Sequence, residues 1–334
     1  MATFLVTSKM NPELAARIES AVRGGVRRVS VRRSPGRVAA TRFLVILTLM
    51  LSLAFLGLSL RAQRIEFDAA KARLEQQVSA EMNKVSPSGW KLLPAATAAL
   101  SAAAQPLKED FVADVLKDRA RFAALLARPI LYLRADLGDV NSEGSIERAA
   151  ADANKDAFVA CLLDPPSARD EEPILKKVRA VYRGEAFQEQ RGSNVRRLFD
   201  LFYAMNFLRP EWASRVQRAR DVIEVGELQH KFDEAQVERM IPATQAQLLI
   251  YVLDEPKKLG TAVELDGASD HWVRLGIVEF QAQGDALQSH TLLSVHRHLD
   301  PKWISEGARS RYAVGMDACR LAADLWTDVT KEAQ

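Results

Sequence analysis

Four of the five histidines of this 334-residue chain lie near its C-terminus: His271, His290, His296 and His298. The segment LQSHTLLSVHRHL (287–299) predicts a strand, on which the last three of them would share one face because side chains alternate with a period of two. Two imidazoles on one strand can bind zinc or copper if a neighbouring strand adds a further ligand, such as Glu279 or His271. His296 and His298 are therefore the candidate metal-ligating residues.

A half-buried strand explains the same histidines without a metal. Gln288 and Ser294 would lie on the histidine face, and the opposite face would carry Thr291, Leu293, Val295 and Leu299. This division of polar and apolar residues is typical of an antiparallel strand with one face in water. We favour this solvated face over the metal site.

The two cysteines, Cys161 and Cys319, each fall on an apolar helical stripe. Outside the cytoplasm they could form a disulfide. Because cysteines on separate core faces are more often buried thiols, we predict that both are unpaired.

Motifs for nucleotide binding and common hydrolytic chemistry do not occur in the sequence. G-x-x-x-x-G-K-[ST], G-x-G-x-x-G, H-E-x-x-H, G-x-S-x-G and C-x-x-C are all missing. Asp164 and the acidic run 170–172 lie beside prolines and indicate a loop. We therefore expect no catalytic residue and no bound cofactor.

The element whose role is clearest is an uncharged apolar segment, residues 43–60, which holds twelve Leu, Ile, Val or Phe. As an α-helix it would span about 27 Å, close to the roughly 30 Å hydrocarbon core of a bilayer. Its few polar residues, Thr48, Ser52 and Ser59, form no stripe. The long leader and the poor cleavage site SLRAQ argue against a removed signal sequence. The segment predicts one uncleaved transmembrane helix.

Charge predicts the orientation of this helix. Residues 1–42 contain nine Lys or Arg and two Glu, although the whole chain has a net charge of only +3. Positive residues beside a membrane helix stay in the cytoplasm, which predicts a basic, disordered cytoplasmic tail over 1–42. Arg27 to Arg42 would contact anionic lipid heads. We do not expect nucleic-acid binding, because GGVRRVSVRRSPGR has no aromatic residue for base stacking.

Composition favours a bacterial cell envelope. Arg outnumbers Lys by 32 to 14, which is typical of a GC-rich genome, and no N-x-Ser/Thr sequon occurs. We therefore expect an inner-membrane protein whose C-terminal part lies in the periplasm.

Beyond the anchor, residues 61–85 predict a helical stalk that ends at SPSG (86–89). Ala70, Leu74, Val78 and Met82 would form a stripe on it. The stripe fits a coiled-coil seam of a homodimer or contact with the protein's own helical domain.

The remaining chain predicts a helical domain (86–241) and a small α+β domain (242–334). Apolar stripes separated by prolines indicate the first, with one helix of up to about 30 residues after Pro210. The segments QLLIYVL, HWVRLGIVEF and LQSHTLLSVHRHL predict about three antiparallel strands in the second. A helix from near Ser305 would cover the sheet, with Asp317 and Asp324 off an apolar stripe formed by Ala308, Tyr312, Met316, Cys319, Ala323 and Trp326.

The predicted fold class is a single-pass membrane-anchored protein with a mostly α-helical external region and a small C-terminal α+β domain. We favour a non-enzymatic scaffold or assembly subunit of a cell-envelope complex, with protein partners on the stalk or the helical domain. A receptor-like ligand-binding module is the alternative, followed by a metal-dependent enzyme that uses His296 and His298.

Overall fold

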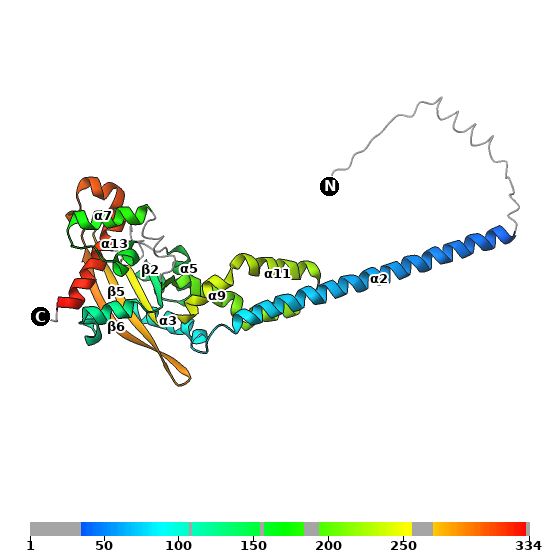
Figure 1. Ribbon diagram of the computed structural model, residues 1–334, viewed down its shortest axis with the longest axis horizontal. Helices are drawn as coiled ribbons and strands as arrows, with labels where there is room; N and C mark the ends of the chain where they lie inside the picture. Colours follow the sequence, from blue (N-terminus) through cyan, green and yellow to red (C-terminus); the bar gives the residue numbers. More distant parts are fainter. Residues whose placement is uncertain (1–34, 107–108, 154–156, 184–193, 256–269, 332–334) are drawn as a thin grey trace, which may run out of the picture. The chain divides into compact units, whose positions relative to one another are not determined.

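The computed structural model describes residues 35–106, 109–153, 157–183, 194–255 and 270–331 (Figure 1). The chain divides into two units, Met1–Ile65 and Glu66–Gln334. Most of the predicted basic tail, including Arg27, lies outside the described residues. Its last part, residues 35–42, is not disordered as predicted but helical, and Pro35 suits a first helical turn because the missing N–H would be unpaired there.

The first unit contains the apolar part of helix α2 (Pro35–Met82). Its large apolar side chains are exposed, including Phe43 at 68% and Phe55 at 75%. Among the described helices, the stretch Phe43–Met82 is the one long and apolar enough to cross a membrane. The predicted helix over residues 43–60 is therefore present as a long apolar helix.

The second unit contains a six-stranded mixed sheet with the strand order β1-β6-β5-β4-β2-β3. The central strand β4 pairs in parallel with β2 and antiparallel with β5. Strand β3 continues the parallel side, and β6 and β1 continue the antiparallel side. The strands are β1 (Phe111–Val112), β2 (Ile130–Asp136), β3 (Val195–Arg197), β4 (Leu248–Glu255), β5 (His271–Gln283) and β6 (Ala286–Leu299).

Helices cover both faces of this sheet, so the unit has three layers. One face packs against α4 (Arg119–Leu126), α6 (Ala157–Leu163), α7 (Glu171–Tyr182) and α13 (Glu306–Lys331). The other face packs against the end of α2 and against α3 (Gly89–Ala103), α5 (Glu143–Asp152), α9 (Leu198–Leu208), α10 (Pro210–Arg218), α11 (Val222–Ala235) and α12 (Val237–Met240). Single-turn 3-10 helices complete it: η1 (Asp114–Leu116), η2 (Leu137–Val140), η4 (Ile241–Gln245) and η5 (Pro301–Trp303).

The expectation of about three antiparallel strands is incomplete. The three expected strands are present as β4, β5 and β6, but β1, β2 and β3 join them in the same sheet. These additional strands come from residues 86–241, which were predicted to be a helical domain. Strand β2 pairs with β4 along its whole length, so both sequence regions contribute to one sheet.

Two helical predictions also change. The single helix expected after Pro210 is interrupted, because Asp221 accepts a hydrogen bond from the Glu224 N–H and caps a new helix, α11. The stripe on the predicted stalk is not open for a coiled-coil partner: Leu74 and Val78 are 0% and 2% exposed and belong to the core of their own unit. The helical-domain contact is therefore the correct alternative for this stripe, and homodimerisation through another surface is untested.

Candidate functional site

The sheet carries a buried cluster of charged side chains on the face that α13 covers. Arg134 of β2 donates two hydrogen bonds to Asp254 of β4, at 2.9 and 3.0 Å. The Nε2 atom of His271, on β5, lies 3.0 Å from the Oδ1 atom of Asp254. The side chains of the three residues are 8%, 0% and 4% exposed. The carboxylate of Asp254 on β4 therefore contacts side chains from both neighbouring strands, β2 and β5.

Strand alternation explains why these residues meet. Arg134 follows Ile130 and Tyr132 on one face of β2, and Asp254 follows Ile250 and Val252 on the same face of β4. The charges stand near the carboxyl ends of both parallel strands, where each apolar run stops.

The electrostatics of Asp254 favour its ionised form. Burial by itself would raise the pKa of this carboxyl, but the Arg134 guanidinium and the hydrogen bond to His271 outweigh it and hold the pKa below the usual value. A doubly hydrogen-bonded Arg–carboxylate pair also fixes the orientation of both groups. Asp254 therefore holds Arg134 and His271 together.

Asp317 of α13 belongs to the same region, although the sequence pattern placed it off the buried stripe. It is 2% exposed, and the Trp303 indole N–H donates to its Oδ1 atom at 3.3 Å. Its Oδ2 atom has no hydrogen-bond partner among the described residues. Burial, the largest effect, raises the pKa of Asp317 to about 6 despite the opposing influence of Trp303, His271 and Arg134. The sequence pattern, which left Asp317 off the buried stripe of this helix, is therefore wrong at this residue.

Two carboxyl groups with pKa values moved in opposite directions beside a histidine can in principle supply an acid and a base. Here all of these side chains are enclosed by the sheet and α13. The cluster joins strands β2, β4 and β5 to each other and to α13. The geometry supports a structural role for the cluster.

The predicted metal residues lie on the opposite face of the sheet, at the same end. His296 stacks on Trp272 at 4.4 Å between ring centroids, and its Nε2 atom lies 3.1 Å from Oε2 of Glu255. His298 is 5.0 Å from the same indole, and its Nε2 atom is 3.5 Å from Oδ2 of Asp270. Glu255 also accepts a hydrogen bond from Arg274 at 2.5 Å. The histidines therefore pair with separate carboxylates around a partly exposed tryptophan.

The third predicted histidine does not share their face. Ile277 pairs with Leu293 whereas the next residue, Val278, pairs with Thr291, so Leu292 is an extra residue in the ladder. This bulge inverts the alternation, and His290 lies on the other face from His296 and His298. The period-two argument failed here because the sequence gives no sign of the bulge.

Glu279 and His271, the expected further ligands, do not lie beside His296 and His298 either. His271 faces α13 and contacts Asp254, and Glu279 forms an ion pair with Arg128 at 2.5 Å. Among the described residues, no group of three or more His, Cys, Asp or Glu side chains is arranged to hold a metal ion.

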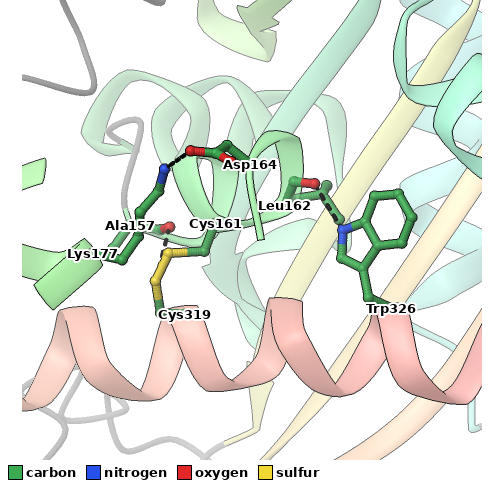
Figure 2. The surroundings of a disulfide bond; sticks show 7 residues. All are labelled: Ala157, Cys161, Leu162, Asp164, Lys177, Cys319 and Trp326. Atoms are coloured by element: carbon green, nitrogen blue, oxygen red, sulfur yellow. Dashed lines mark hydrogen bonds and ion pairs between the residues drawn. A yellow bond between two sulfur atoms is a disulfide. The ribbon is translucent and has the colours of Figure 1, made fainter. Parts of the chain in front are cut away.

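The two cysteines form a disulfide, which corrects the prediction of buried thiols (Figure 2). Cys161 of α6 and Cys319 of α13 have Cα atoms 5.2 Å apart. Helix α6 packs directly on α13, so the two apolar stripes belong to one core and not to two. The Trp326 indole N–H donates to the Leu162 carbonyl oxygen at 2.9 Å, and Lys177 pairs with Asp164 at the end of α6.

Comparison of the chain with protein-family models, curated proteins and solved structures finds no match.

The sequence analysis did not identify Arg134 and Asp254 as site residues, although the sequence pattern around each of them is unusual. The segments ILYLRAD and LLIYVLDE each place a charged residue on the buried face of an otherwise apolar run.

Proposed function

We propose that this protein is a non-enzymatic scaffold or assembly subunit of a bacterial cell-envelope complex. Residues 43–60 would anchor it in the inner membrane, with the N-terminus in the cytoplasm and the folded unit in the periplasm. The disulfide between Cys161 and Cys319 supports this location, because disulfides persist in oxidising compartments.

The observation that carries the scaffold proposal is a two-stranded arm formed by β5 and β6, residues 281–289 (Figure 1). Strand β4 pairs with β5 only as far as Glu279, and β1 pairs with β6 only at Leu293 and Ser294. Within the described chain, both outer edges of the arm are therefore without a neighbouring strand. Unpaired N–H and C=O groups of such edges pair readily with a strand of another protein.

The arm is built to remain extended while exposed. Gly284 has a φ of 57°, which a two-residue hairpin turn requires. The residues around this turn, Gln281, Gln283, Asp285 and Gln288, are polar and exposed. Polar side chains keep the arm soluble without a partner, and the backbone edges provide the binding surface.

The proposal is tested by native mass spectrometry of the full chain, extracted with its surrounding membrane, together with site-specific photocrosslinking. We expect an assembly of fixed stoichiometry and a crosslink from position 288 to the same partner. A photocrosslinker at exposed Glu172 on α7 is the matched control and should not capture that partner. A monomer with no arm crosslink would contradict the scaffold.

A small pocket favours the second candidate, a ligand-binding module. It measures about 190 Å³ between α3 and the base of the arm, and its lining includes four residues that carry a hydroxyl group: Tyr251, Ser289, Thr291 and Ser294. Gly276 lies beneath the Tyr251 ring, where any Cβ would come within 2.0 Å of it. A stoichiometric small molecule in the native mass spectrum, lost after Ser294→Leu, would favour this candidate.

A further inference from the structure

The corner between α10 and α11, residues 218–223, combines exposed arginines with exposed aliphatic side chains. Arg218 and Arg220 are exposed, and Ile223 and Val222 are 75% and 41% exposed. In the same unit, Val225 and Leu228 of α11 are buried in the core. Val222 and Ile223 are thus the part of α11 left outside the core.

The arginines of the corner are available for an anionic ligand. The Nε atom of Arg218 donates to the Ser214 carbonyl oxygen at 3.1 Å, and neither Arg218 nor Arg220 has an ion-pair partner among the described residues. A pocket of about 420 Å³ adjoins them, lined by Arg215, Arg218, Arg220, Glu224, Glu227, Leu228 and Lys231. The Glu224 carboxylate accepts a hydrogen bond from the backbone N–H of Arg220 at 2.9 Å.

The corner lies beside the first residues of α2 that belong to the second unit. The Lys71 ammonium group donates to the Gln217 carbonyl oxygen, and Gln229 donates to Gln77 at 2.8 Å. Helix α11 therefore runs along α2 with its N-terminal end toward Lys71. In the sequence, Lys71 follows Leu60, the last residue of the apolar segment, by only eleven positions.

We propose that the α10–α11 corner docks on the anionic phospholipid surface of the membrane that holds residues 43–60. Arg218 and Arg220 would pair with lipid phosphates, for which guanidinium groups are well suited. Val222 and Ile223 would enter the boundary between head groups and acyl chains, as the apolar residues of interfacial helices do. The proposal rests on the anchor in the proposed function.

The size of the corner favours lipid over a protein partner. A stable protein interface buries about 800 Å² on each side, more than two aliphatic side chains and two arginines provide. A lipid contact held close by the anchor needs little affinity of its own, because the tether keeps the local concentration of lipid high. Anionic lipids attract each nearby arginine by about 1 kcal/mol.

The test places an environment-sensitive fluorophore on Ile223→Cys in the full chain, since the native cysteines are paired. The labelled protein is reconstituted into nanodiscs of phosphatidylcholine alone or mixed with phosphatidylglycerol. In the mixed discs we expect blue-shifted emission and quenching by lipids with a spin label near the head group. Arg218→Glu combined with Arg220→Glu should abolish both effects, and a label on Glu172→Cys should show neither.

Alkaline carbonate extraction of the same samples separates the two proposals. A water-exposed, unquenched label at position 223 in a chain that resists extraction would overturn the docking and leave the anchor intact. A chain released by carbonate would contradict the anchor, and with it the docking. Emission that shifts with protein concentration and not with lipid charge would indicate a second copy of the chain and would also overturn the proposal.

Discussion

Asp317 shows how one buried carboxyl makes stability depend on pH. Its pKa rises from 3.8 to about 6 on folding, so the folded protein holds this proton more tightly than the unfolded chain does. The stabilising effect of this proton is complete below about pH 4 and is lost as the pH rises through about 6. At neutral pH the ionised Asp317 therefore costs the folded state stability, by about 3 kcal/mol at most.

The first prediction is that Asp317→Asn stabilises the protein at pH 7.5 and has little effect at pH 4. Asparagine keeps an oxygen that can accept the Trp303 indole N–H but carries no charge. Urea melts of the solubilised full chain at both pH values measure the difference. Asp324→Asn is the control: Asp324 pairs with Arg169 and Arg320 at 3.3 Å near the surface, and its loss should cost about 1 kcal/mol or less at either pH. Equal midpoints for the Asp317 variant and the wild type at pH 7.5 would contradict the argument.

The second prediction concerns the pair of Arg134 with Asp254. Asp254→Ala removes the carboxylate that pairs with two nitrogen atoms of the buried Arg134 guanidinium, and should cost about 3–5 kcal/mol of unfolding free energy. Arg134→Met together with Asp254→Leu should cost less than Asp254→Ala alone, because neither charge of this pair then remains in the core. The exposed pair Arg209 and Glu143, at 3.5 Å, is the matched control, and Glu143→Ala should change stability by less than about 1 kcal/mol. A double variant as unstable as the sum of its single variants would show that the pair is not coupled.

Among the elements, the strongly patterned ones could be predicted from the sequence. Strands β4, β5 and β6 and helix α13 have long runs whose period identifies them. Strand β2 has seven residues and β3 has three, and a short apolar run such as ILYLRAD fits a buried helix as well as a strand. The partnership of β2 with β4 depends on residues more than a hundred positions apart in the chain, and no local pattern encodes it.

The candidate site could be predicted only in part for the same reason. The H-x-H pair is visible in the sequence, but the bulge at Leu292 decides which histidines share a face. Asp317 sits one residue after the buried Met316 on α13, a position that a simple stripe assigns to solvent. It is buried because η5 brings Trp303 over that side of the helix.

The third prediction concerns the disulfide that joins α6 to α13. It links residues 158 positions apart, and a crosslink over a long loop restricts the unfolded chain strongly. Cys161→Ala combined with Cys319→Ala should therefore lower the unfolding free energy by about 2–5 kcal/mol. Reduction of the wild type with a phosphine should give a similar loss in urea melts. Unchanged stability after complete reduction would contradict this role.

At the scale of the whole molecule, the disulfide bears on our proposal that the folded unit lies outside the cytoplasm. A pair of cysteines in the cytoplasm is kept reduced, whereas the periplasm oxidises it. The charge difference across residues 43–60 predicts that the folded unit is exported. The oxidation state of Cys161 and Cys319 therefore tests the predicted export of the folded unit.

The fourth prediction is that the wild-type protein from acid-quenched bacteria, denatured so that the buried cysteines are accessible, resists thiol alkylation unless a reductant is added first. A variant without residues 43–60 should remain in the cytoplasm, and both Cys161 and Cys319 should then react without reduction. If the apolar helix is an uncleaved anchor, as we propose, the mass of the membrane-extracted chain should equal the full 37.1 kDa. Alkylation of the wild type without reduction would place the folded unit in the cytoplasm, and a product beginning near Gln63 would mean that the helix is a cleaved signal.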